Sequence, residues 1–224
     1  MLEPSAARFA TRCAARHLSG GNMQLIGMLD SPYVRRVAIS LRLLDLPFEH
    51  QAVSVFSTFD QFRAINPVVK APTLVCDNGV VLMESGLILD YAEMLATRSL
   101  MPAQHEQRQH ALRVTGLALA ACEKTVQIVY ERNLRPAEKQ HAPWIERVQG
   151  QLHAACAALE TELAGAALPT DERLLTQADV SAAVAWSFTQ LMLPACVEAS
   201  AYPALAAFSA AAERLAVFKD TPQA

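Results

Sequence analysis

Residues 24 to 96 alternate between short strand-like runs and helical runs. The predicted strands cover 24–28, 48–55, 73–76 and 80–83. The last two are joined by Asp77-Asn78-Gly79, a sequence typical of a β-hairpin turn. Apolar residues at helical spacing predict helices over 31–44, 58–66 and 84–96. The order β-α-β-α-β-β-α is typical of a sheet with crossover helices.

The rest of the chain is predicted to be entirely helical. The predicted helices cover 104–134, 136–167, 176–193 and 203–217. Thr176 and Asp179 have the spacing of a capping box, in which each side chain bonds the other residue's backbone N–H, and Leu175 can pack on Val180. We therefore expect an α/β domain over 23–97, a linker over 98–103, where helical periodicity is absent, and an all-helical domain over 104–224.

The first 22 residues differ in composition from the rest of the chain. Arg8, Arg12 and Arg16 repeat at every fourth position, and Gly20-Gly21 closes the segment. An arginine-rich, acid-poor helix of this kind resembles an organelle targeting peptide. The alternative, which we favour, is a disordered or mis-assigned extension with Met23 as the true initiator, because the first strand begins there.

Composition and charge limit the kinds of partner that the protein is expected to bind. The chain has 224 residues, of which 52% are hydrophobic and 18% charged, with a formal net charge of -3. This balance predicts a compact protein and gives no global attraction to nucleic acid or to an anionic membrane. Every apolar stretch is shorter than the roughly 18 residues of a spanning helix. Small molecules and other proteins are therefore the expected partners.

Neither the cysteines nor the histidines indicate a metal site. The cysteines are odd in number and scattered, without CxxC spacing, which favours buried free thiols and a cytoplasmic location; they are Cys13, Cys76, Cys122, Cys156 and Cys196. The histidines lack HExxH or comparable ligand spacing, and we expect surface positions for His50, His105, His110, His141 and His153. No metal is therefore predicted.

Four short motifs, in this order and at these spacings, indicate a family. They are Ser31-Pro32-Tyr33-Val34-Arg35-Arg36, then Asn66-Pro67 with Lys70-Ala71-Pro72, then Glu84-Ser85, and finally Thr176-x-x-Asp179. From residue 24 onward the chain resembles the cytosolic glutathione S-transferases, and its Ser-Pro-Tyr segment looks closest to bacterial members. The resemblance implies a thioredoxin-like domain followed by an all-helical domain, glutathione as co-substrate, a small hydrophobic electrophile as second substrate, and a homodimer.

Ser31 is the catalytic candidate that this resemblance implies. A thiol with a pKa near 8.5 is only a few per cent ionised at pH 7, so a hydroxyl donor and the amides of a helix N-terminus can raise the thiolate fraction. A lower pKa also lowers nucleophilicity, so positioning of the electrophile should contribute more to the rate. The alternative is that Ser31 only caps its helix. Tyr33 is the backup donor.

The same resemblance assigns the glutathione contacts. It implies a cis peptide bond before Pro72, with the Ala71 backbone pairing with the peptide, and Lys70 neutralising the glycyl carboxylate. Ser85 is expected to cap its helix and to bind the γ-glutamyl carboxylate, while Glu84 accepts from the α-ammonium. The alternatives are a solvated Lys70 and an ordinary helix start at Glu84-Ser85.

Other functions remain open. A glutathione-dependent isomerase is expected to carry Ser-Ser-Cys where this chain has Asp30-Ser31-Pro32, and a redox enzyme is expected to have cysteine at position 31; peroxidase activity is a further alternative. The alternative outside enzymes is a regulatory protein-binding module without catalysis. Because the set of glutathione-site residues is intact, we rank this alternative second. Tyr130, Arg132 and Arg135 are expected on a solvated helix face, although they could instead face the electrophile.

Overall fold

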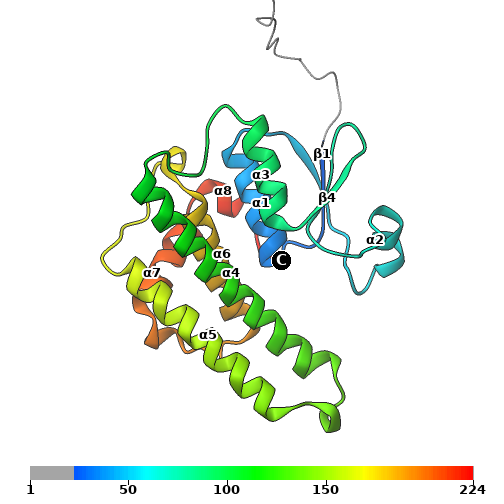
Figure 1. Ribbon diagram of the computed structural model, residues 1–224, viewed down its shortest axis with the longest axis vertical. Coiled ribbons are helices and arrows are strands. Elements are labelled where there is room, and N and C mark those ends of the chain that lie inside the picture. Colours follow the sequence, from blue (N-terminus) through cyan, green and yellow to red (C-terminus); the bar gives the residue numbers. More distant parts are fainter. Residues whose placement is uncertain (1–22, 224) are drawn as a thin grey trace, which may run out of the picture.

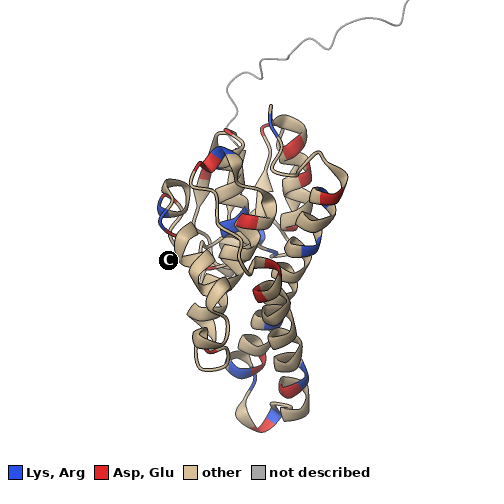
Figure 2. Ribbon diagram, turned by 90° about the vertical axis from the view of Figure 1, so that its left-hand side faces the viewer, with Lys and Arg blue, Asp and Glu red and all other residues tan. Residues whose placement is uncertain are grey.

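The computed structural model describes residues 23–223 of the chain, and the expectations for residues 1–22 lie outside this range. The chain forms an α/β domain followed by a helical domain (Figure 1). In the view of Figure 2, acidic and basic residues are interspersed along the helices. No helix within the described range is long and apolar enough to span a membrane.

The first domain has the predicted order of elements. It consists of β1 (Met23–Ile26), α1 (Pro32–Leu43), β2 (Phe48–Gln51), α2 (Phe59–Ile65), β3 (Thr73–Val75), β4 (Val81–Met83) and α3 (Ser85–Leu95). The strand order in the sheet is β2-β1-β3-β4, with β1 and β2 parallel and the other pairs antiparallel. This topology confirms the predicted thioredoxin-like domain.

Side-chain alternation along β1 gives the sheet two covered faces. Leu25 is buried with Leu74 of β3 and Val37 of α1 in the main core. Its neighbour Ile26 points to the opposite face, where it packs with Phe62 of α2 and Val53 in a smaller cluster. The second strand is shorter than predicted and ends at Gln51, because β1 supplies no residue beyond Ile26 in the register opposite it.

The second domain contains α4 (His105–Leu134), α5 (Ala142–Leu163), α6 (Gln177–Met192), α7 (Pro203–Ala212) and α8 (Ala216–Lys219). Two predicted helices were too long. Residues 136–167 form a short 3₁₀ turn (Ala137–Lys139) before α5, whose first turn contains Pro143. Residues 203–217 break after Ala212, where the chain turns into α8.

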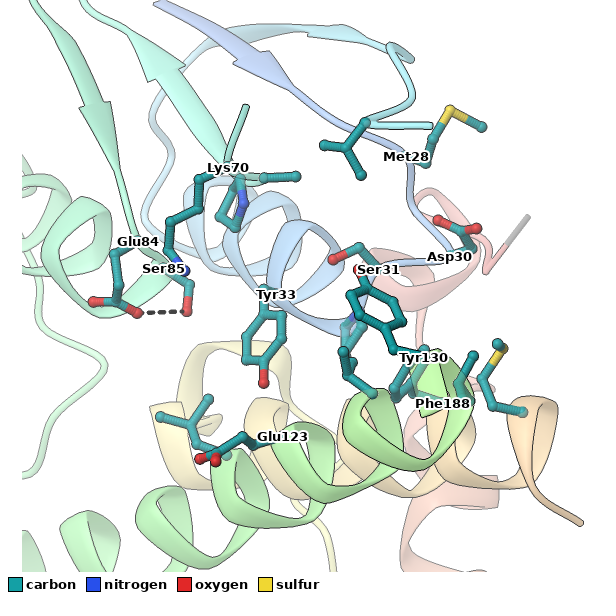
Figure 3. Close-up of a pocket in the computed structure, with 18 of the residues that line it drawn as sticks. Met28, Asp30, Ser31, Tyr33, Lys70, Glu84, Ser85, Glu123, Tyr130 and Phe188 are labelled. Atoms are coloured by element: carbon teal, nitrogen blue, oxygen red, sulfur yellow. Dashed lines mark hydrogen bonds between the residues drawn. The ribbon is translucent and has the colours of Figure 1, made fainter. Parts of the chain in front are cut away.

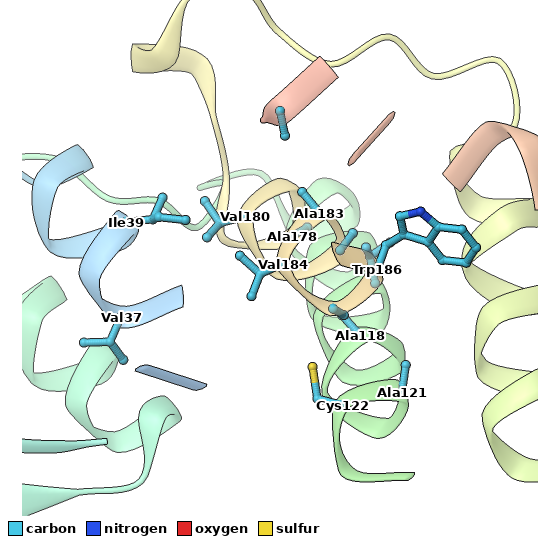
Figure 4. Packing of buried hydrophobic residues seen from close by; sticks show 14 of the residues in the cluster. Val37, Ile39, Ala118, Ala121, Cys122, Ala178, Val180, Ala183, Val184 and Trp186 are labelled. Carbon is cyan, nitrogen blue, oxygen red and sulfur yellow. The ribbon is translucent and has the colours of Figure 1, made fainter. Parts of the chain in front are cut away.

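Small side chains allow α6 to pack closely with its neighbours. Ala118 of α4 and Ala178 and Ala183 of α6 are buried in the main core, and Val180 and Val184 of α6 face α1 of the first domain (Figure 4). The predicted capping box starts α6: Thr176 N donates to Asp179 Oδ2 over 2.8 Å, and Asp179 N donates to Thr176 Oγ1 over 3.4 Å. The capping box thus fixes the first turn of the helix that supports α1.

Candidate functional site

A cavity of about 940 Å³ lies between the two domains. Its α/β wall comes from the starts of α1 and α3 and from the loop before β3, and its helical wall comes from α4 and α6 (Figure 3). Every residue predicted for catalysis or for binding glutathione lines it, namely Ser31, Tyr33, Lys70, Ala71, Pro72, Glu84 and Ser85. Segments more than 50 residues apart therefore converge on one space.

Ser31 occupies the position just before α1. Its backbone is extended, with φ -69° and ψ 122°, and its carbonyl accepts the first helical hydrogen bond from Arg35 N over 2.9 Å. Its hydroxyl, however, makes no capping bond to the helix. The half-buried hydroxyl is therefore not engaged in holding α1 together.

Tyr33 points away from Ser31. Its hydroxyl is directed toward Glu123 of α4 (Figure 3). Burial raises the pKa of Tyr33, and the nearby Cys122 and Glu123 raise it further. The phenol therefore stays protonated at neutral pH and faces the helical wall.

The loop before β3 carries the predicted cis peptide bond between Ala71 and Pro72, which the structure confirms. Asn66, buried behind the loop, donates from Nδ2 to Thr73 Oγ1 over 2.8 Å, and Thr73 Oγ1 donates to the Lys70 carbonyl over 2.8 Å. These bonds hold the loop from behind and leave the Lys70 side chain exposed at the cavity.

The start of α3 differs from the prediction. Glu84, not Ser85, is the N-cap: its carboxylate accepts from Gly86 N and Leu87 N over 3.0 and 3.1 Å. The left-handed backbone of Glu84 (φ 74°) turns the chain into the helix at that point. Burial alone would raise the pKa of Glu84, but the two amide bonds and the Ser85 hydroxyl outweigh it and lower the pKa.

The Ser85 hydroxyl has a different partner. Ser85 is buried, and its Oγ accepts a hydrogen bond from Arg36 Nη1 over 2.9 Å. The same hydroxyl donates to Glu84 Oε1 over 3.4 Å (Figure 3). The expectation that the Ser85 side chain caps α3 is therefore wrong, because the preceding carboxylate already occupies the amides.

An aromatic pair spans the cavity's two walls. Phe56, from the loop after β2, meets Tyr130 of α4 edge to face, with ring centroids 5.6 Å apart and planes at 80°. Tyr130 is 43% exposed, as expected for a solvated helix face, and it also lines the cavity, as the alternative expected. Arg132 and Arg135 are exposed and do not line the cavity.

Sequence reasoning missed Phe56 and Glu123. Phe56 lies in an exposed turn outside any periodic run, and Glu123 is one of many charged residues on the long helix α4.

Two histidines that were predicted to lie on the surface are half-buried. His50 Nε2 lies 2.7 Å from the Gly27 carbonyl, and His153 Nδ1 lies 3.1 Å from the Tyr202 hydroxyl. His50 therefore lies against a backbone oxygen and His153 against a phenol oxygen.

Within residues 23–223 no group of three or more His, Cys, Asp or Glu side chains could hold a metal ion. The cysteines in that range are free thiols; Cys76, Cys122 and Cys156 are buried and Cys196 is half-buried. Burial raises the pKa of Cys122 and of Cys156 to about 12. The thiols of Cys122 and Cys156 therefore do not ionise near neutral pH.

Comparison with known proteins connects this architecture to a family. Residues 25–99 match the family model of the glutathione S-transferase N-terminal domain. A glutathione S-transferase of Methylobacterium radiotolerans, solved in complex with glutathione sulfonate, superposes with a TM-score of 0.80 at 26% identity, over 91% of this chain and 96% of that chain. The chain has the glutathione S-transferase fold.

More relatives share this fold or part of the sequence. A glutathione S-transferase from Methylobacillus flagellatus with glutathione bound gives a TM-score of 0.81 at 24% identity, over 91% of this chain and all of that chain. The GST-like protein YibF of Escherichia coli is 25% identical over 79% of this chain and 88% of its own length. Glutathione S-transferase U6 of Arabidopsis thaliana is 31% identical over 64% of this chain and 61% of its own.

Proposed function

We propose that this protein is a glutathione transferase that conjugates or reduces small hydrophobic electrophiles. The observation that carries the proposal is the convergence of Ser31, the Ala71–Pro72 loop and the Glu84–Ser85 helix start on one cavity. Relatives with the same fold have been solved with glutathione or an analogue bound. A hydroxyl, a loop that lines the cavity and a helix N-terminus together suit a peptide that carries a thiol.

The proposed site holds glutathione by three groups. Ala71 offers its backbone N–H and C=O to the cysteinyl peptide, as an edge strand pairs with an added strand. Lys70, exposed at the cavity, neutralises the glycyl carboxylate. Ser85, through its N–H at the start of α3, binds the γ-glutamyl carboxylate, and Glu84 accepts from the ammonium.

Ser31 is the proposed activating residue. Its hydroxyl donates to the thiolate sulfur, and the unpaired amides of the first turn of α1 add positive potential. The thiolate then attacks the electrophilic carbon, a C–S bond forms, and the leaving group departs with its electron pair. The absence of a capping bond supports this role, because the hydroxyl is available without loss to the helix.

The proposed electrophile lies against the helical wall. Phe56 and Tyr130 together form an aromatic side of the cavity, and Phe188 and Met192 of α6 extend its apolar lining. An apolar wall with few polar groups is typical of a site for small organic ligands. A role in detoxification of such compounds is consistent with this lining, and the free thiols suit a reducing cytoplasm.

We also propose a homodimer. Leu87 and Met94 lie two turns apart on α3 and are 65% and 79% exposed, and Val81 of the edge strand β4 is also exposed. The seven-residue spacing puts Leu87 and Met94 on one face of α3, and exposed apolar side chains of this kind mark an association site. A second copy of this chain is the proposed partner.

Calorimetric titration with glutathione, followed by a conjugation assay with 1-chloro-2,4-dinitrobenzene and a small panel of other electrophiles, tests the proposal. We expect saturable binding and thiolate-dependent turnover. Binding without turnover of any electrophile would favour the regulatory module. Absence of binding would overturn the proposal altogether.

A further inference from the structure

Two adjacent buried arginines on α1 have very different surroundings. Arg35 uses all three guanidinium nitrogens, with bonds to Glu213, Ser187 Oγ and backbone carbonyls. Arg36 is only 3% exposed, yet its guanidinium makes one hydrogen bond, from Nη1 to Ser85 Oγ. Its Nε is buried and has no partner among the residues described.

Such an arrangement is costly for a cation. A buried charge needs an opposite charge and full hydrogen bonding to offset the loss of water. The ion pairs within the described chain do not include Arg36. Burial lowers the pKa of Arg36 to about 10, which still leaves it charged at neutral pH. Arg36 is therefore a buried positive charge without an ion-pair partner among residues 23–223.

The nearby groups do not supply that anion. Cys122 is buried with its pKa raised to about 12, and Tyr33 also has a raised pKa, so both remain neutral. Glu84 is charged and near enough to influence the pKa of Arg36, but its carboxylate is bonded to the amides of α3. Within residues 23–223, therefore, no carboxylate forms an ion pair with Arg36, and an anionic ligand group in the cavity is suited to supply one.

Ser85 connects Arg36 to the cavity. Because its Oγ accepts the Arg36 N–H, the hydroxyl hydrogen has to point elsewhere. It donates to Glu84 Oε1 over 3.4 Å, a bond at the long end of hydrogen-bond range. Ser85 also lines the cavity, so an acceptor on a ligand can replace this long bond with a shorter one.

We infer that Arg36 is a positioning residue for an anionic ligand group, acting through the Ser85 hydroxyl at the start of α3. It orients that hydroxyl as a donor and places a buried positive charge behind it. The group it serves is the carboxylate on the first residue of glutathione. This inference rests on the proposed function and deepens it.

The test compares two ligands on matched variants. The ligands are glutathione and 4-aminobutyryl-cysteinyl-glycine, which keeps the amine, thiol and glycyl carboxylate but lacks the carboxylate on the first residue. Calorimetry on the wild type should show a preference for glutathione of about ten- to a hundredfold, the range for a hydrogen bond to a charged group. Arg36→Gln should remove most of this preference by weakening glutathione alone, and Arg36→Lys should restore part of it.

Two controls separate positioning from a general structural role. Arg35→Gln changes a neighbour that is equally buried but makes no bond to Ser85, so it should lower thermal stability and keep the wild-type preference. Glutathione esterified at its glycyl carboxylate should lose the same factor in affinity on the wild type and on Arg36→Gln. If Arg36→Gln does not fold, Ser85→Ala serves in its place, since it removes the hydroxyl and keeps the backbone N–H.

The outcomes are distinct. A folded Arg36→Gln, or Ser85→Ala in its place, with the wild-type preference would overturn the inference and leave the proposed function standing. A wild type that binds glutathione no better than the shortened analogue would also overturn it. A wild type that binds neither ligand would overturn the proposed function and this inference together.

Discussion

Arg35 of α1 and Glu213, 178 residues later, form a two-bond ion pair. Nη1 lies 2.6 Å from Oε1, and Nη2 lies 2.7 Å from Oε2. Arg35 is 1% exposed and Glu213 35% exposed. The same guanidinium donates from Nε to the Thr221 carbonyl over 2.8 Å. The pair therefore ties the helix that starts at Ser31 to the C-terminal part of the helical domain.

We expect Glu213→Gln to destabilise the protein because it leaves Arg35 buried without a counter-charge. Breaking a buried pair from one side costs about 3 to 5 kcal/mol, and the partial exposure of Glu213 favours the lower end. For a chain of this size that corresponds to a fall in melting temperature of roughly 6 to 12 °C. Differential scanning calorimetry measures it.

The matched control is the exposed pair between Asp60 and Arg63 on α2, with an N–O distance of 3.0 Å. Asp60→Asn should cost less than about 1 kcal/mol, since exposed ion pairs contribute little. Equal effects of the two substitutions would contradict the role assigned to burial.

Local chemistry made most of the fold predictable. The β-hairpin turn at Asp77-Asn78-Gly79, the proline at the start of α1 and the Thr176–Asp179 capping box each depend on residues a few positions apart. The break between α7 and α8 was not predictable in this way. It lies in an alanine-rich run with continuous helical periodicity, and Glu213, just after α7, bonds to a residue far away in the sequence.

The candidate site was predictable only as a set of residues. The motifs predicted that Ser31, Lys70 and Glu84 belong to one site. They did not predict the hydrogen-bond partners of Glu84 and Ser85. Which of two adjacent polar residues caps α3 depends on the left-handed backbone of Glu84, and the partner of Ser85 comes from a different helix. Such pairings are tertiary, and neither propensity nor spacing encodes them.

The proposed dimer surface gives a second prediction. Light scattering should give the wild type a mass of about twice 24.3 kDa. Met94→Glu places a charge on the most exposed apolar side chain of α3 and should yield monomers, because burying an unpaired carboxylate is unfavourable. Leu134→Glu, at the distant end of α4, is the matched control and should leave the mass unchanged. A monomeric wild type would rule out the proposed dimer.

A third prediction follows from the lowered pKa of Glu84. Folding favours the ionised carboxylate, so its contribution to stability is present above the unfolded pKa of about 4.3 and is lost as pH falls through the lower folded pKa. Glu84→Gln should therefore cost about 1 kcal/mol at pH 7, the usual value of an N-cap. Urea unfolding at several pH values should show this difference shrinking between pH 5 and 3. A difference independent of pH would contradict the charged cap.

A fourth prediction concerns the start of α6. Thr176→Ala removes the acceptor for Asp179 N and should cost about 1 kcal/mol in urea unfolding. Asp179→Ala should cost more, because its carboxylate accepts shorter bonds, 2.8 Å from Thr176 N and 2.7 Å from Thr176 Oγ1. The opposite ranking would mean that the threonine hydroxyl, not the carboxylate, is the main cap.

The last prediction separates the two candidate activating hydroxyls. If Ser31 donates to the glutathione sulfur, Ser31→Ala should raise the pKa of bound glutathione by roughly one to two units, the equivalent of one hydrogen bond to a charged group. Thiolate absorbance, titrated against pH, measures this. Glutathione affinity should change little, since other groups hold the peptide, and turnover should fall less than the pKa shift suggests, because a less stabilised thiolate is more reactive.

Tyr33→Phe is the matched comparison, since it also removes one hydroxyl at the cavity. Its hydroxyl points toward Glu123, so the thiolate titration should remain at the wild-type position. Ser31→Ala should also leave the melting temperature within about 2 °C of the wild type, because the hydroxyl makes no capping bond whose loss would cost about 1 kcal/mol. A stability loss without a shift in the titration would make Ser31 a cap after all. A shift in Tyr33→Phe alone would assign the activation to the phenol.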